Sequence, residues 1–194
     1  MVSITIDENN NKVIQILNLT IQETMLLKSL EEFYSNKNNF KILETIVSGN
    51  NLISRRTIEY FVTKYSNLQN TTYLIEQNNK KIKFNVYSSY KDQLKCHKKK
   101  YFDPFGRGDR VPFFSNETCV ITTIGQLNFY RWFISKDIYK YCLDNHNEIQ
   151  DSLRSNFNKT KKKSSKKKYP NYCKNTIIKA QYNAPINLSV SFDI

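Results

Sequence analysis

The sequence predicts a single α+β domain made of helices and β-hairpins. Apolar residues recur at helical spacing behind Ser and Thr residues that suit a helix N-terminus, and short alternating runs come in pairs around polar turns. Of the 194 residues, 39% are apolar and 13% are aromatic. That composition is sufficient for one sizeable hydrophobic core.

The first 20 residues are expected to form a β-hairpin, because residues 2–7 and 12–19 alternate around a polar turn. Thr20 and Glu23 then form a capping box for a helix over residues 21–36. A second helix is expected after Asn38 and Asn39, and Gly49 ends it.

A third helix begins behind Ser54, and residues 72–76 and 81–86 alternate as the strands of another hairpin. Three helices followed by a hairpin, here over residues 21–86, is the order of a winged-helix domain. In that interpretation the third helix carries Arg55 and Arg56 to DNA. The alternative is that the three helices only pack against one another.

Residues 87–157 are expected to hold a basic helix, an aromatic loop, a hairpin and two helices. The basic helix is predicted to continue to Asp103, because the residue before a proline is disfavoured in the α-helical conformation. Residues 111–115 and 118–122 form the hairpin, and Thr123 and Gln126 cap the next helix. That helix is apolar on nearly all sides, which means deep burial or a protein interface.

The lysine-rich tract of residues 158–175 has no apolar periodicity and is expected to be flexible, and residues 176–194 are expected to form one or more strands. The net charge of +13 is concentrated in two places. Residues 91–110 have a surplus of four positive charges, and residues 159–168 contribute seven lysines and no acid. An A/T-rich genome also favours lysine codons, but such a bias does not explain this clustering.

Basic side chains interleaved with aromatic rings suit a surface that neutralises phosphates and stacks on bases, so nucleic acid is the predicted partner, with DNA favoured over RNA. The alternative is a solvated lysine face over a core. The predicted phosphate contacts are Lys91, Lys95, Lys98, Lys99, Lys100, Arg107 and Arg110. Tyr101 and Phe105 are expected to stack on bases or to shape the loop. The expected basic arm consists of Lys161, Lys162, Lys163, Lys166, Lys167 and Lys168.

A second hypothesis is a virion or viral-factory scaffold protein that binds another protein through the helix of residues 124–134. Tyr130, Arg131 and Trp132 lie in that helix, and these residue types are frequent at interface hot spots.

An enzyme is not expected, because the sequence lacks a phosphate-binding loop, a dinucleotide-binding glycine motif and metal-ligand spacings. Asp103 and Asp109 leave only a remote hypothesis of a metal-dependent nuclease. The four cysteines are far apart, so no metal or cofactor is predicted. No apolar run reaches the length of a membrane span and no secretory leader is present, so an intracellular location without membrane contact is expected.

Several runs of the central sequence resemble a protein family of the nucleocytoplasmic large DNA viruses, the mimivirus-like giant viruses among them. The resemblance covers about residues 40–155 and rests on the runs at 84–87, 90–95, 99–107 and 122–132. It implies a viral origin and a place in the cytoplasmic viral factory or the virion, but no activity. Import into the nucleus through residues 161–168 is an alternative.

Overall fold

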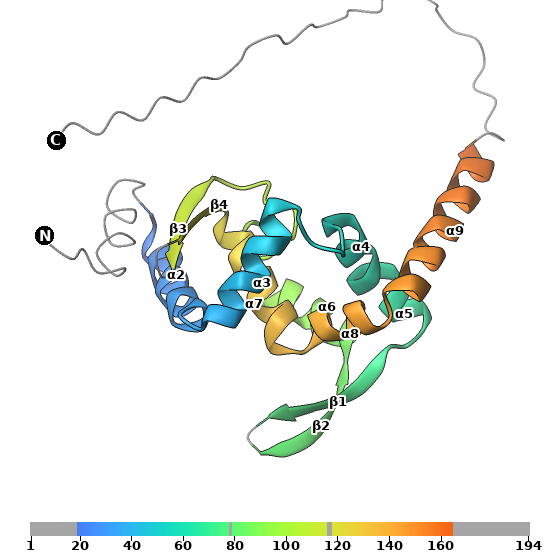
Figure 1. Ribbon diagram of the computed structural model, residues 1–194, viewed down its shortest axis with the longest axis horizontal. Coiled ribbons are helices and arrows are strands. Elements are labelled where there is room, and N and C mark those ends of the chain that lie inside the picture. The colour runs from blue at the N-terminus through green and yellow to red at the C-terminus, as the bar shows by residue number, and fades with distance from the viewer. Residues whose placement is uncertain (1–18, 78, 116–117, 165–194) are drawn as a thin grey trace, which may run out of the picture.

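The computed structural model describes residues 19–77, 79–115 and 118–164, and these form one α+β domain (Figure 1). The helical elements are α2 (Ile21–Tyr34), α3 (Lys37–Ser48), α4 (Arg55–Tyr60), the π-helix η1 (Phe61–Tyr65), α5 (Ser66–Leu68), α6 (Val86–Cys96), the 3-10 helix η2 (Lys99–Tyr101), α7 (Ile124–Ser135), α8 (Ile138–Asp144) and α9 (His146–Ser164). The strands are β1 (Thr72–Gln77), β2 (Lys80–Asn85), β3 (Val111–Ser115) and β4 (Thr118–Thr122).

Side-chain caps begin the first two helices; the cap of α2 was predicted, whereas α3 starts at Lys37, earlier than predicted. The Thr20 and Glu23 capping box at the start of α2 is present. Asn36 caps α3, because its Oδ1 accepts hydrogen bonds from the amides of the two asparagines that were expected to precede this helix. Gly49 ends α3 with a φ of 81°, a left-handed conformation that glycine adopts without strain.

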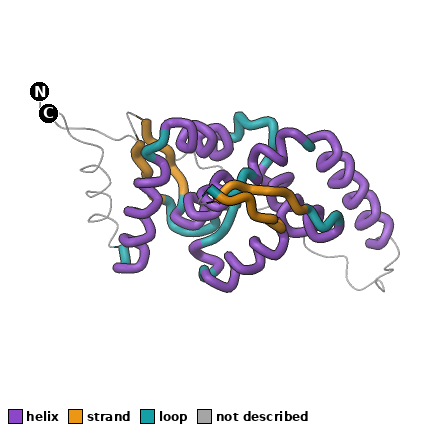
Figure 2. The backbone as a smooth tube through the Cα atoms, turned by 90° about the horizontal axis from the view of Figure 1, so that it is seen from below, coloured by secondary structure: helices purple, strands orange, loops and turns teal. Residues whose placement is uncertain are grey.

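Two of the three predicted hairpins lie within the described residues, and both are confirmed. Strands β1 and β2 pair antiparallel from Thr72 and Asn85 to Gln77 and Lys80, and this hairpin projects from the helical body (Figures 1 and 2). Strands β3 and β4 pair over residues 111–115 and 118–122, with the bounds that alternation predicts.

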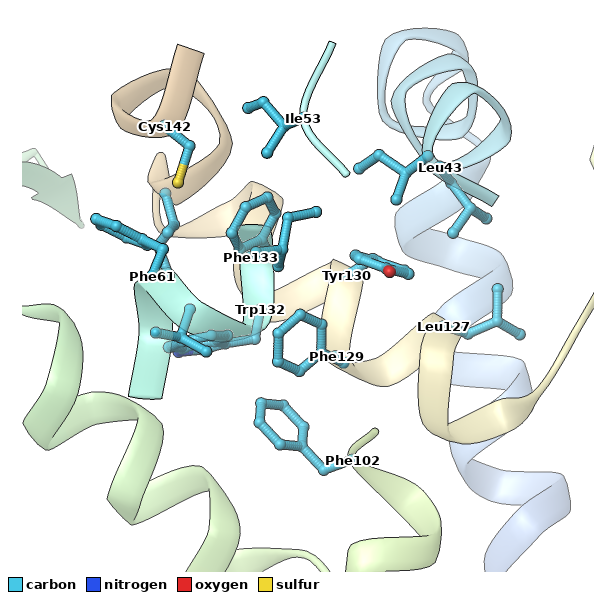
Figure 3. Packing of buried hydrophobic residues seen from close by; sticks show 14 of the residues in the cluster. Leu43, Ile53, Phe61, Phe102, Leu127, Phe129, Tyr130, Trp132, Phe133 and Cys142 are labelled. Atoms are coloured by element: carbon cyan, nitrogen blue, oxygen red, sulfur yellow. The ribbon is translucent and has the colours of Figure 1, made fainter. Parts of the chain in front are cut away.

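Helix α7 lies at the centre of the core. Its rings pack with Phe102 from the loop after η2 (Figure 3), and the ring centroids of Phe102 and Phe129 are 5.1 Å apart. Phe129 and Phe133 stack with centroids 6.1 Å apart. Clustered aromatic rings of this kind contribute packing energy beyond the area that they bury.

The winged-helix interpretation finds no support in the packing. Helices α2 and α3 pack against each other and against α7, whereas α4 packs on η1 and α9. The first three helices therefore share the core of the whole domain and do not form a three-helix core of their own. The Arg56 guanidinium lies 4.1 Å from the centre of the Phe157 ring, so this side chain packs on α9.

Helix α6 ends earlier than predicted. Cys96 is its last residue, and His97 is extended, with φ −115° and ψ 136°. The His97 ring stacks on Phe102 with centroids 5.9 Å apart. Because the helix ends here, Tyr101 and Phe102 can enter the core. Lys98, which was predicted to lie on the basic helix, comes after the end of α6.

Helix α9 continues to Ser164, so the first residues of the tract that was expected to be flexible, 158–164, have a helical backbone. The rest of that tract, the strands expected over 176–194 and nearly all of the N-terminal hairpin lie outside the described residues.

Candidate nucleic-acid interface

The loop after η2 is fixed to the first turn of α7 by close backbone packing. A Cβ atom at Gly125 would lie 2.5 Å from the carbonyl oxygen of Lys100, so only glycine fits at this contact. The Asp103 amide donates to the carbonyl of Gly125 at 3.2 Å, and the Asn128 side chain donates to the carbonyl of Tyr101 at 2.9 Å. The loop therefore has a defined position relative to α7.

Pro104 and Gly106 complete this attachment. The side-chain Nε2 of Gln126 and the Tyr130 hydroxyl both donate to the carbonyl of Pro104, at 3.1 and 3.0 Å. Gly106 has a φ of 63°, and a Cβ atom there would collide with the Gln126 side chain. The Gln126 side chain therefore holds the loop and does not complete a capping box.

Asp103 binds Arg107 through both carboxylate oxygens. Arg107 donates from Nη2 to Oδ1 at 2.8 Å, and from its amide and Nε to Oδ2 at 3.1 and 3.2 Å. Burial raises the pKa of Asp103, but the hydrogen bonds from Arg107 outweigh it, so the net effect is a lowered pKa. Asp103 is thus a structural partner of Arg107.

Glu23 connects α2 to the same loop. Its Oε1 accepts from Lys100 Nζ at 2.8 Å and from the Tyr101 hydroxyl at 3.3 Å. Its Oε2 accepts from the Thr20 amide and hydroxyl at 3.0 and 2.8 Å. The Lys100 hydrogen bond lowers the pKa of Glu23 to about 2, against the opposing effect of burial. Four hydrogen bonds occupy the acceptor sites of this carboxylate.

Two adjacent hollows open on the loop. The larger, of about 430 Å³, is bounded by the start of α2, by η2, by residues 108–111 and by the start of α7. The smaller, of about 350 Å³, is lined by Lys99, Lys100, Asp103, Arg107 and Gly108. Lys100 and Gly108 line both hollows, which therefore lie side by side.

The predicted phosphate contacts are all exposed, but they do not form one set. Lys91 and Lys95 lie on α6, and Lys95 pairs with Asp92 at 3.3 Å. The cations that line the hollows are Lys99, Lys100, Arg107 and Arg110. Lys98 precedes them at the start of the loop and is also exposed. In the part of the chain that the structure describes, Lys99 and Arg110 have no carboxylate within ion-pair distance.

The predicted aromatic contacts behave differently from each other. Tyr101 is only 8% exposed and its hydroxyl donates to Glu23, so little of its ring is available for stacking on bases. Burial gives it the other role, that of shaping the loop. Phe105 is half-buried, and the Arg107 guanidinium lies 5.4 Å from the centre of its ring.

The predicted protein interface on α7 is wrong. Tyr130 and Trp132 are buried in the core, and the Trp132 indole donates to the Ser89 hydroxyl at 3.0 Å. Arg131 bonds Ser29 and Asn128, each at 2.8 Å. The apolar character of this helix reflects burial.

The remaining basic residues lie elsewhere. Arg55 is half-buried and Arg56 packs on Phe157, and neither lines the two hollows described above. The backbone of Lys161, Lys162 and Lys163 belongs to α9, and the other three lysines of the predicted arm, at 166–168, lie outside the described residues.

Sequence reasoning missed the roles of Glu23, Gly108 and Gly125. Glu23 was expected only as a cap, and its bond to Lys100 spans 77 positions. The chain has only four glycines, three of them here, and this scarcity was the available signal. Among residues 19–77, 79–115 and 118–164, no cluster of His, Cys, Asp or Glu is suited to a metal ion. The helices of the described part include none that is long and apolar enough to cross a membrane.

Comparison with known proteins identifies the family. Residues 4–193 match the model of a family of unknown function, DUF7197. A protein of Acanthamoeba polyphaga mimivirus, named "Uncharacterized protein L507", is 32% identical over 163 residues, which are 80% of this chain and 61% of that protein. The chain thus spans about three fifths of the length of this curated relative. No solved structure gives a significant match. The chain belongs to the DUF7197 family, which confirms its resemblance to giant-virus proteins.

Proposed function

We propose that this protein binds nucleic acid, DNA rather than RNA, as a non-enzymatic component of the viral factory or the virion, with entry to the nucleus through residues 161–168 as an alternative. The observation that carries the proposal is the gathering of Lys99, Lys100, Arg107 and Arg110 around two adjacent hollows. The net charge of +13 favours a polyanionic partner.

The four cations differ in what they offer to a phosphate. Lys100 and Arg107 already neutralise Glu23 and Asp103, so they fix the shape of the surface and contribute less net charge. Lys99 and Arg110 have no such partner among the described residues and supply the larger share of attraction to phosphate. Lys98 adds a further exposed positive charge beside them.

The test is a fluorescence-anisotropy titration of a labelled DNA duplex at several salt concentrations. The variant Lys99→Gln with Arg110→Gln is compared with the control Lys37→Gln with Lys140→Gln, which removes two exposed charges from α3 and α8. Each phosphate contact contributes about 0.9 to the slope of log affinity against log salt, so the first variant lowers the slope by about 1.8 if each side chain neutralises one phosphate. The proposal fails if the control loses as much affinity, or if no salt-dependent binding occurs.

The lysines of residues 159–168 are expected to add a sequence-independent contribution. Their deletion should weaken binding without abolishing it, because the folded surface retains its own cations. Complete loss of binding on this deletion alone would assign the activity to the tract and remove the folded surface from the proposal. Binding to a structured RNA of equal charge tests the preference for DNA.

A further inference from the structure

The two hollows differ in net charge. In the smaller one, Lys99, Lys100 and Arg107 face a single carboxylate, that of Asp103. In the larger one, Lys100 and Arg110 are balanced by Glu23 and Asp109. Phosphate is therefore attracted to the smaller hollow, while the larger one is electrically balanced.

The larger hollow also has apolar walls. Leu19, Val111 and Ile124 line it together with Tyr101, and its volume of about 430 Å³ lies in the range of pockets that take small ligands. The hydroxyl-bearing residues Thr20 and Thr123 lie among these apolar side chains. Planar groups with polar edges, such as nucleobases, suit a pocket of this composition.

The Glu23 carboxylate at this pocket is already satisfied by Lys100, Tyr101 and Thr20. It has no acceptor site left for a metal ion or a cationic ligand. The pocket therefore suits a ligand part that is itself neutral.

We propose that the two hollows together bind one unpaired nucleotide, with its phosphate in the smaller hollow and its base in the larger. This inference rests on the proposed function for its ligand. Lys100 lies between the two parts and contacts the phosphate. A base inside a duplex is paired and stacked and must leave the stack to enter such a pocket, which costs free energy. The protein therefore prefers single-stranded to duplex DNA.

Gly108 provides a selective test, because it lines both hollows and a Cβ atom there meets nothing within 4 Å. Gly108→Trp places a large side chain at the hollows, and Gly108→Ala is the matched control. Thermal unfolding by circular dichroism verifies that both variants fold. The natural protein and both variants, each as the full chain, are then titrated into labelled single-stranded DNA and labelled duplex at one salt concentration, and binding is measured by fluorescence anisotropy.

The expected result is that Gly108→Trp weakens single-strand binding about tenfold or more, in line with the loss of one base contact, and changes duplex binding less than about twofold. Gly108→Ala changes neither. Equal weakening of both ligands by Gly108→Trp, or no weakening of either, overturns the nucleotide site and leaves duplex binding standing.

Calorimetric titration with deoxyadenosine monophosphate, with inorganic phosphate as a comparison, separates a strand ligand from a free nucleotide. If neither nucleic acid binds, the proposed function fails, and this titration alone decides the site. Heat from the nucleotide that Gly108→Trp abolishes supports the site with a free nucleotide as its ligand. Absence of that heat together with absence of strand binding overturns it.

Discussion

Glu23 is expected to stabilise the fold by an amount that depends on pH. Its pKa is lowered from 4.5 to about 2, chiefly by the hydrogen bond from Lys100. At about 1.36 kcal/mol per tenfold change in proton affinity, folding favours the ionised carboxylate by ~3 kcal/mol. The Lys100 side chain is 52% exposed, so water screens its charge and reduces the contribution to about 2 kcal/mol.

The direction of this pH dependence follows from the linkage between proton binding and folding. A carboxyl group whose pKa is lower in the folded state than in the unfolded state stabilises the protein fully above the unfolded pKa of 4.5. The stabilisation decreases as the pH falls from there to about 2, where the folded carboxylate also binds a proton. Glu23→Gln, which imitates the protonated form, should therefore be less stable than the natural protein at neutral pH and nearly equal to it in strong acid.

Urea denaturation followed by circular dichroism measures this difference at neutral pH and at a series of acidic values. Glu32→Gln is the control, because Glu32 is exposed on the same helix. A Glu23→Gln protein as stable as the control at neutral pH would refute the reasoning. A loss of stability of the same size at every pH would do so as well, since the charge would then play no part.

A glycine substitution and the alkylation of cysteines provide two further tests of the packing. Gly125→Ala should lower the free energy of unfolding by about 2 kcal/mol, because the added methyl group meets the carbonyl oxygen of Lys100, whereas Gly108→Ala should change it little. Urea denaturation of both variants checks this, and equal stability would contradict the close contact. Alkylation of the folded protein should modify the exposed Cys96 well before Cys142, whose thiol is buried and has a raised pKa for that reason. Peptide mass spectrometry at successive times measures the order, and rapid labelling of Cys142 would show that the core is open.

Local features of the fold could be predicted from the sequence because they depend on neighbours in the chain. The cap at Thr20, the end of α3 at Gly49 and the bounds of β3 and β4 all depend on residues within a few positions. The end of α6 depends on a distant contact. His97 leaves the helix because its ring meets Phe102 and because Phe102 belongs to the core around α7, which helical spacing does not reveal.

The candidate site was predictable in its charges but not in its aromatic residues. The clustering of charge in the sequence singled out four cations that are exposed around the hollows: Lys99, Lys100, Arg107 and Arg110. Tyr101 and Trp132 are residue types that are frequent at binding surfaces, yet both are buried. An aromatic ring suits a core and a ligand equally well, so only the arrangement of the whole chain decides between the two.

Helix α9 carries the chain away from the rest of the domain. The last turns of this 19-residue helix extend away from the body (Figure 1), and each residue adds about 1.5 Å of length and roughly 100° of rotation. Insertion or deletion of a single residue there changes both the distance between the body and the end of the helix and the angle around the helix axis at which the helix ends. A flexible linker would absorb such a change, whereas a helix transmits it to its own end.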